Sequence, residues 1–195
     1  MTNSLLHRRE FIILAAIDVI NECGISSFST KEVSKRVGIS EPAIFKHFKT
    51  KVDLLNAVIE RFSHYDCDVI HSLRSKKLNA IESMILFINT YATYYENYPA
   101  ITELTQSFEE FRRDPNFTDK IQEILQTRKN FIIELIRKGK ASGELKTEIN
   151  EEQLAVTILG MEREWCLNWR FSGYSFSLKE KISSNLDMLI KLLRP

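Results

Sequence analysis

The chain has few of the residues that interrupt helices or cross-link small folds. Its 195 residues contain 6 glycines, 4 prolines and 3 cysteines. So few glycines and prolines argue against a sheet-rich fold with many tight turns and favour helices. The cysteines are widely spaced and include no CxxC pair, which excludes a disulfide framework. We therefore expect a mainly helical protein in a reducing compartment.

Long apolar runs and a strong net charge are also missing. A membrane-spanning helix needs about 20 apolar residues in succession, and no segment approaches that length. The opening residues MTNSLLHRRE lack the apolar core of a signal peptide. The 27 lysines and arginines nearly balance 26 aspartates and glutamates, and the formal net charge of +1 excludes nucleic-acid binding through bulk charge. We expect a cytoplasmic protein that does not enter a membrane.

The charges are unevenly divided along the chain. Residues 1–51 carry eight lysines and arginines against five acidic residues, a net charge of +3. The remaining residues carry 19 against 21, a net charge of −2. A mildly basic head therefore precedes a mildly acidic body. We place the domain boundary here, which gives domains 1–51 and 52–195.

Two helices with defined ends open the head. Apolar residues at three- and four-residue spacing predict an amphipathic helix over residues 5–23, and Gly24 follows where a helix needs a left-handed residue. Ser29 and Glu32 have the spacing of a capping box, which starts a second helix. Gly38 ends that helix after only two turns.

A tight turn leads from this second helix into a third. Ser40 is the predicted N-cap of the third helix, with Pro42 in the first turn, where proline costs no hydrogen bond. Thr50, with Asp53 three residues later, caps a fourth helix. Two short helices joined by a glycine-containing turn, and supported by a longer first helix, make a helix-turn-helix unit.

The body is helical almost throughout, with prolines, a glycine and capping pairs at the helix ends. The predicted helices lie near 51–73, 77–97, 99–112, 117–141, 151–171 and 177–193.

Several segments of the head follow a known pattern in register. They are Ala15-Ala16, Gly24, FSTKEV at 28–33, GIS at 38–40, IFKHFKTK at 44–51 and Leu54-Leu55. Together they resemble the DNA-binding domain of TetR-family transcriptional regulators over about residues 8–60. The resemblance implies an all-α protein of about nine helices, with a three-helix helix-turn-helix domain followed by a helical ligand-binding and dimerisation domain. It also implies a homodimer, usually a repressor, that releases operator DNA when a small molecule enters the body.

The resemblance assigns DNA-contacting roles to residues of the head. Positions that usually meet the phosphate backbone are Thr30, Phe45, His47 and Lys51, and positions that commonly meet base edges are Lys31, Glu41, Pro42, Ala43 and Lys46. The side chains at most of these positions suit the implied roles, since a lysine can donate to guanine and a glutamate can accept from a cytosine amino group. Without the resemblance, the lysines are ordinary surface charges and Glu41 is a favourable first-turn carboxylate.

One position departs from the family pattern. Members usually have tyrosine where this chain has Phe45, so the phenolic hydroxyl that would bond a phosphate is missing. That loss should weaken backbone contact by about 0.5–1.5 kcal/mol. The alternative is that Phe45 serves mainly in packing.

Aromatic residues gather in the body. Tyr91, Tyr94, Tyr95 and Tyr98 lie at three- and four-residue intervals on one side of their helix. Such a stripe is either core or interface, or the wall of a cavity whose polar groups bind the hydroxyls. The predicted ligand pocket consists of Phe62, Tyr65, Tyr91, Tyr94, Tyr95, Phe108 and Trp165.

The last two helices carry the predicted dimer interface. Trp165 and Trp169 lie one turn apart among charged residues, which suits the edge of an interface, with pocket lining as the alternative. The final helix has an apolar stripe that, paired with helix 151–171, is typical of half a four-helix bundle between two copies. The predicted interface residues are Trp169, Ile182, Leu186, Leu189 and Leu193.

One helical face carries side chains that can bind a transition metal: His64, Cys67, Asp68 and His71. One helix rarely closes such a site, because positions i and i+7 lie about 10.5 Å apart. The alternative is an ordinary helix flank, and we predict no metal and no cofactor.

Motifs of catalysis are missing, including a nucleophile elbow, a phosphate-binding glycine loop and HExxH. We therefore predict a DNA-binding regulator rather than an enzyme. Its partners would be double-stranded operator DNA, a second copy of the chain and an unidentified small molecule. The alternatives are a DNA-bound adaptor whose body docks a protein partner and binds no ligand, and, more distantly, a helical-bundle enzyme.

Overall fold

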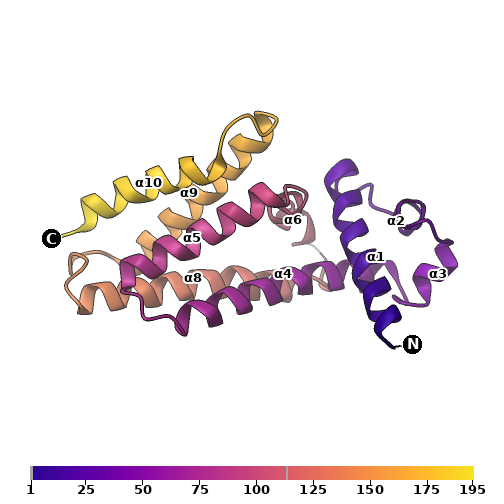
Figure 1. The fold of residues 1–195 in the computed structure, drawn as a ribbon, viewed down its shortest axis with the longest axis horizontal. Coiled ribbons are helices and arrows are strands. Elements are labelled where there is room, and N and C mark those ends of the chain that lie inside the picture. The colour runs from indigo at the N-terminus through magenta and orange to yellow at the C-terminus, as the bar shows by residue number, and fades with distance from the viewer. Residues whose placement is uncertain (1, 113) are drawn as a thin grey trace. The chain divides into compact units, whose positions relative to one another are not determined.

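The computed structural model describes residues 2–112 and 114–195, and every regular element in this part of the chain is an α-helix (Figure 1). The helices are α1 (Thr2–Cys23), α2 (Thr30–Val37), α3 (Glu41–Phe45), α4 (Lys51–Arg74), α5 (Ala80–Asn97), α6 (Ile101–Gln106), α7 (Phe108–Phe111), α8 (Thr118–Ala141), α9 (Glu151–Phe171) and α10 (Leu178–Leu193). The predicted all-α fold is confirmed. None of these helices is long and apolar enough to cross a membrane.

The segment 99–112, predicted as one helix, contains the two short helices α6 and α7. Ser107 separates them, with backbone angles of φ −87° and ψ 7°. Its hydroxyl donates to the carboxylate of Glu103 at 3.0 Å, a local bond of the kind that competes with helix continuation. The described chain therefore has ten helices, where the sequence predicted about nine.

Most of the predicted helix caps are present. The side chain of Ser29 accepts from the backbone N–H of Glu32. Thr50 and Asp53 exchange the two hydrogen bonds of a capping box, at 3.0 and 2.9 Å. In the body, Asn150 and Ser177 cap α9 and α10 in the predicted way, by accepting from Gln153 and Glu180.

Ser40 stands at the N-cap of α3, but its side chain makes no capping bond. Two of the N–H groups that such a side chain could bond are already accounted for. Pro42 has no N–H, and the N–H of Ala43 donates to the carbonyl oxygen of Ser40 at 2.9 Å. The helix is also shorter than the predicted 41–47. It ends at Phe45, and His47 bonds back to the carbonyl of Ile44 in a turn.

The chain forms two compact units. The first consists of Met1–His64 and Pro99–Gln122, and the second of Tyr65–Tyr98 and Glu123–Pro195. The first unit extends beyond the helix-turn-helix segment because α6 packs on α1. The boundary between domains 1–51 and 52–195 stays a prediction.

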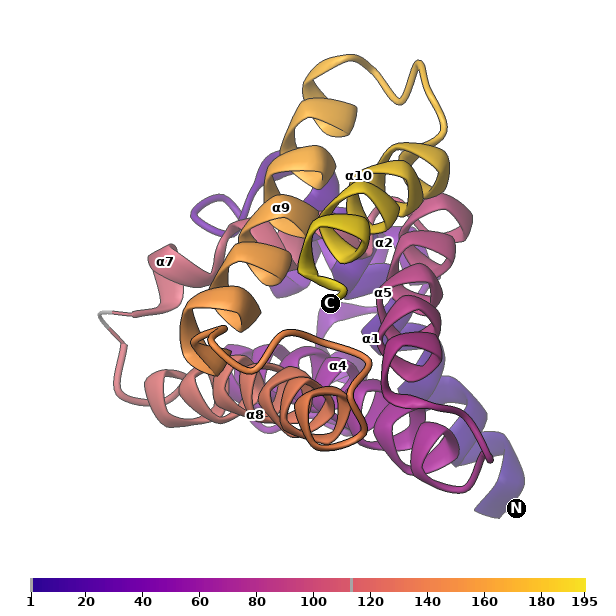
Figure 2. The ribbon, with the colours of Figure 1, turned by 90° about the vertical axis from the view of Figure 1, so that its left-hand side faces the viewer.

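Each unit has its own apolar core. In the first, the stripe of α1 is buried together with Val33, Ile44 and Phe48 from the next two helices and the turn after them. In the second, α10 packs on both α5 and α9 (Figure 2). Ile182, Leu186 and Ile190 form the buried face of α10.

Candidate functional site

The first unit presents a mainly polar surface around α3. Ile44 and Phe48 hold α3 in the core, so the residues between and before them face outward. The predicted DNA-contacting residues Lys31, Pro42, Phe45, Lys46 and Lys51 are exposed, and Glu41, Ala43 and His47 are half-buried. Phe45 is 43% exposed, so much of its ring faces outward. Thr30 differs from the others, since it is buried with 7% of its surface exposed.

The buried hydroxyl of Thr30 is used inside the protein. It donates to the carboxylate of Glu41, with 2.5 Å between Thr30 Oγ1 and Glu41 Oε1. This bond links the first residue of α2 to the first residue of α3. A carboxylate fixed in this way loses little rotamer entropy when it meets a hydrogen-bond donor, because its side chain is already ordered.

Lys51, at the start of α4, is also held by the head. Its ammonium donates to the carbonyl oxygen of Phe28 at 2.5 Å and lies 5.4 Å from the centre of the Phe28 ring. An ammonium has three donors, so this bond leaves donors for a phosphate. Phe28 itself is buried, and the contact therefore anchors a surface cation to the core.

The second unit contains a buried cluster of charged and phenolic side chains. The guanidinium of Arg128 donates twice to the carboxylate of Asp66, with both distances 2.8 Å. A third N–H of Arg128 donates to the hydroxyl of Tyr95 at 3.2 Å, and Tyr91 donates its hydroxyl to Asp66 at 2.8 Å. The guanidinium carbon also lies 4.0 Å from the centre of the Tyr91 ring. Helices α4, α5 and α8 each contribute to this arrangement.

Glu162, on α9, is the acidic residue next to this cluster. Only 5% of its surface is exposed, and its Oε1 atom has no hydrogen-bond partner among the described residues. Removal from water raises the pKa of its carboxyl to about 7. The positive charge of Arg128 opposes this shift and the negative charge of Asp66 adds to it. Burial likewise raises the pKa of the Tyr91 and Tyr95 hydroxyls, so both stay protonated at neutral pH.

The family of the chain follows from comparison with known proteins. A model of the N-terminal region of bacterial regulatory proteins of the tetR family matches residues 12–58. A second model, described as the C-terminal region of YsiA-like proteins, matches residues 56–192. The chain belongs to the TetR family of transcriptional regulators.

Individual TetR-family relatives extend over nearly the whole chain. The fatty acid metabolism regulator protein of Bacillus subtilis is 26% identical over 184 residues, which cover 92% of each chain. The nucleoid occlusion factor SlmA of Vibrio atlanticus is 24% identical over 188 residues, covering 96% of this chain and 94% of that protein. The crystal structure of FadR from Bacillus subtilis in complex with stearoyl-CoA superposes with a TM-score of 0.79 at 24% identity, covering 93% and 97% of the two chains.

The predicted pocket residues of this TetR-family body do not form one group. Phe62 and Phe108 pack edge to face at 6.0 Å in the core of the first unit. Trp165 packs against Phe176, in the second unit. The four tyrosines do come together, and two of them, Tyr65 and Tyr94, are stacked with ring centres 4.2 Å apart. Tyr65 and Tyr94 line an open groove of about 360 Å³ that also includes Thr90, Asn97 and Lys179.

Three of the predicted dimer-interface residues are corrected by their burial. Trp169, Ile182 and Leu186 are almost or completely buried within a single chain, and the indole N–H of Trp169 donates to the carbonyl of Phe176 at 2.8 Å. A side chain without exposed surface cannot contact a second copy. Leu189 and Leu193 are partly exposed.

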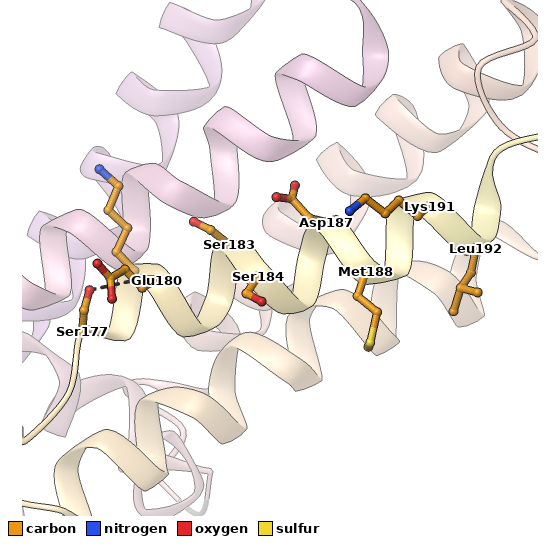
Figure 3. Close-up of a pocket in the computed structure, with 9 residues that line it drawn as sticks. Ser177, Glu180, Ser183, Ser184, Asp187, Met188, Lys191 and Leu192 are labelled. Atoms are coloured by element: carbon orange, nitrogen blue, oxygen red, sulfur yellow. Dashed lines mark hydrogen bonds between the residues drawn. The ribbon is translucent and has the colours of Figure 1, made fainter.

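The exposed side of α10 carries a different apolar pair. Figure 3 shows Ser184, Met188 and Leu192 pointing to one side of the helix, and Ser183, Asp187 and Lys191 to the other. Met188 and Leu192 are well exposed, as are Val156 and Phe171 of α9. Gly160 lies one turn after Val156, and a side chain added there would meet nothing within 4 Å. The outward faces of these two helices therefore carry four large apolar side chains in contact with water.

The side chains considered for metal binding remain a solvated helix flank. His64, Cys67, Asp68 and His71 are all exposed on α4. Within the described part of the chain, no group of three or more His, Cys, Asp or Glu side chains is arranged to hold a metal ion.

The buried charged residues that the sequence reasoning missed are Asp66, Arg128 and Glu162. A signal for them was present. Each is a charged residue whose neighbours four positions before and after are buried and apolar, as Phe62 and Ile70 are for Asp66.

Proposed function

We propose that the chain is a sequence-specific DNA-binding repressor that a small molecule releases from its operator. The observation that carries this proposal is the surface around α3, where a fixed carboxylate lies among exposed cations on a helix-turn-helix. α3 enters the major groove in this account, and a dimer places two such helices on half-sites about one helical turn apart.

Within this surface we distinguish base readers from phosphate contacts. Lys46 and Glu41 face the base edges, where an ammonium donates to guanine and a carboxylate accepts from cytosine. Lys31, Pro42 and Ala43 lie beside them. Lys51, His47 and Phe45 adjoin the phosphate backbone, which fixes the position of the protein without reading sequence. Thr30 acts through Glu41, since its hydroxyl is already bonded there.

The dimer forms through the outward faces of α9 and α10. Val156, Phe171, Met188 and Leu192 supply apolar contact area, and Phe171 is 86% exposed in the single chain. Gly160 permits a close approach of the facing helix, which explains a glycine in the middle of α9 despite its cost of about 1 kcal/mol. Two copies of this helix pair make a four-helix bundle with two-fold symmetry.

A dimerisation assay checks this surface. Met188→Glu together with Leu192→Glu should convert the dimer to monomer in light scattering, because it places charges in an apolar interface. Lys191→Glu is the matched control, since Lys191 points to the other side of α10 (Figure 3). A double variant that remains dimeric rules out this surface.

Release by a ligand follows from thermodynamic linkage. A small molecule that binds the DNA-incompetent conformation of the body more tightly lowers the affinity for DNA by the same coupling free energy. A FadR relative was crystallised with stearoyl-CoA, which supports a small-molecule site in the body here.

Capture of genomic DNA tests the function. The purified protein is incubated with fragments of the source genome, and the bound fragments are sequenced. Enrichment of a few discrete sites supports the proposal, and uniform recovery of all fragments rejects it. Metabolites added to the captured complex then identify compounds that release it.

The SlmA relatives favour a second candidate. They are named nucleoid occlusion factors, and the one from Vibrio atlanticus matches 96% of this chain. In this alternative the chain is a DNA-bound adaptor whose body docks a protein and holds no ligand. Thermal unfolding with a metabolite panel separates the two, because a bound ligand raises the midpoint according to its concentration over Kd.

A further inference from the structure

The cluster of Asp66, Arg128, Tyr91, Tyr95 and Glu162 has an unbalanced charge. Asp66 and Arg128 neutralise each other through their paired hydrogen bonds at 2.8 Å. Ionised Glu162 adds one negative charge that the described side chains do not match with an ion pair. Arg128 directs three of its N–H groups at Asp66 and Tyr95.

A buried carboxyl needs hydrogen-bond partners in either protonation state. As a carboxylate it accepts through both oxygens, and as an acid it still has an acceptor and a donor to satisfy. Oε1 of Glu162 has no partner among the described residues, although nine-tenths of the residue and more is buried. Such orphaned polar atoms are rare in folded proteins, because leaving them unpaired opposes folding. A donor supplied by a bound molecule would resolve the defect.

Aromatic rings pack between the cluster and an open groove on the surface. Tyr65 and Tyr94 line the open groove beside Lys179, and they are half-buried. Tyr65 contacts Tyr91 at 5.7 Å and Tyr94 contacts Tyr95 at 6.1 Å, measured between ring centres. The hydroxyls of Tyr91 and Tyr95 in turn reach Asp66 and Arg128. Tyr65 and Tyr94 therefore separate the groove from the charged groups by one layer of aromatic rings.

We propose that Glu162 is the recognition group of the effector site and that the effector carries a protonated amine on an apolar or aromatic frame. The inference rests on the proposed function, in which a small molecule binds the body. An ammonium donates to Oε1 of Glu162 and restores the neutrality of the cluster. The ring of Tyr91 already faces one cation, since the guanidinium carbon of Arg128 lies 4.0 Å from its centre, and Tyr95 adds a second aromatic ring beside it. A carboxylate or phosphate head would instead meet Asp66 and Glu162, two groups of its own sign, while the guanidinium of Arg128 is already paired with Asp66.

Matched amines and alcohols test this assignment without knowledge of the natural ligand. The probes are 2-phenylethylamine with 2-phenylethanol, tryptamine with tryptophol, and octylamine with octanol, and 3-phenylpropanoate serves as the anionic probe. Binding to the full-length chain is measured by calorimetry and thermal shift near neutral pH. We expect the amine of at least one pair to bind about tenfold or more tightly than its alcohol, the factor of a charge-assisted hydrogen bond.

Variants of α9 assign the preference to one residue. Glu162→Gln should remove the difference between amine and alcohol, and Glu162→Met should do the same if the glutamine variant folds poorly. Glu164→Gln is the matched control, because Glu164 is exposed on the same helix and should leave the preference unchanged. The proposal is overturned if no amine is preferred in any pair, if the anion is preferred, or if the preference survives in both Glu162 variants.

Operator binding separates this proposal from the proposed function. If the captured DNA is released by stearoyl-CoA while no amine is preferred, the amine assignment fails and the ligand-responsive repressor stands. If an amine binds in a Glu162-dependent way to a protein that enriches no DNA site, the amine assignment stands and the repressor fails.

Discussion

The hydroxyl of Thr30 donates to the carboxylate of Glu41, with 2.5 Å between the two oxygens. The bond crosses the turn of the helix-turn-helix, since Thr30 begins α2 and Glu41 begins α3. A buried residue of α2 thus fixes an acidic side chain at the start of α3. Base discrimination by Glu41 should therefore depend on a residue that does not itself reach a base.

Thr30→Val tests this dependence, because valine keeps the shape and removes the hydroxyl. We expect it to reduce discrimination at the base pair that Glu41 reads, toward the loss caused by Glu41→Gln, which one hydrogen bond to a charged group puts at about 1.5–3 kcal/mol. The double variant should lose no more than Glu41→Gln alone. Ser34→Ala is the control, since the Ser34 hydroxyl bonds only the carbonyl of Lys31 among the hydrogen bonds of this helix. Additive losses measured on a panel of operator variants would contradict the coupling.

Lys46 and Lys51 should differ in how their loss changes DNA binding. Lys51→Ala removes a phosphate contact, so affinity should fall on all sequences and the salt dependence should flatten by about 0.9 in log–log slope. Lys46→Ala should instead change the preference among sequences. Lys49→Ala is the control, as an exposed lysine two residues from Lys51. The measurement is titration of specific and random duplexes at several salt concentrations. Equal, sequence-blind losses for Lys46 and Lys51 would refute the division of roles.

Phe45→Tyr should strengthen DNA binding. Phe45 is 43% exposed, so a hydroxyl added to the ring reaches solvent or DNA without disturbing the core. One new hydrogen bond to phosphate is worth about 0.5–1.5 kcal/mol, and it should appear on every sequence alike. Affinity on specific and random duplexes, with thermal unfolding as the check on folding, measures it. An unchanged affinity would place Phe45 away from the phosphate backbone.

Glu162 should make the stability of the second unit depend on pH. Burial raises the pKa of its carboxyl from an ordinary 4.5 to about 7, so the folded chain holds a proton that the unfolded chain releases earlier. The contribution of Glu162 to the free energy of unfolding is therefore largest below pH 4.5, falls as pH rises toward 7, and is constant above that. The same region also contains Asp66, Arg128, Tyr95 and Cys166. None of them changes when the parent chain is compared with a Glu162 variant.

Glu162→Gln removes this titration. Relative to the parent chain, it should gain up to about 3 kcal/mol in free energy of unfolding between pH 4.5 and 7. Denaturant unfolding across that range gives the difference curve, with Glu164→Gln as the control. A difference curve without slope would show that the Glu162 carboxyl is not perturbed.

The ion pair of Asp66 and Arg128 should be costly to break. Arg128→Met leaves the Asp66 carboxylate buried without its counter-ion, a change that typically costs about 3–5 kcal/mol. Lys138→Ala breaks an exposed pair with Glu134 on the same helix and should cost less than about 1 kcal/mol. Urea unfolding of both variants provides the comparison. Similar small losses in both would mean that the buried pair contributes no more than a surface one.

The fold and the exposure of the surface around α3 could be predicted because they depend on local rules. Helix periodicity, capping pairs and two left-handed glycines, Gly24 and Gly38, define the helix-turn-helix within a short stretch of chain. The N-cap of α3 is the exception. Ser40 has the right residue type and position for a cap, but the proline two residues later removes an N–H that it would bond.

The body sites were harder to predict because the same apolar pattern serves both core and interface. The apolar spacing of Ile182 and Leu186 predicts a dimer contact, yet α5 and α9 cover both side chains within the chain. Nothing in this spacing distinguishes a neighbouring helix from a partner's helix. The charged cluster depends on four helices far apart in sequence, so residue spacing cannot pair Asp66 with Arg128. The signal that was available is each charge standing alone in an apolar stripe.

Selection of bound duplexes from a randomised library tests the central claim most directly. The parent chain, Lys46→Ala and Lys51→Ala are each taken through the same rounds, and the enriched sequences are compared. The account predicts an inverted repeat for the parent chain, with half-sites about one helical turn apart. It predicts altered bases within the half-site for Lys46→Ala, and the parent sequence at lower affinity for Lys51→Ala. Enrichment of no sequence, or of a motif without two-fold symmetry, would contradict it.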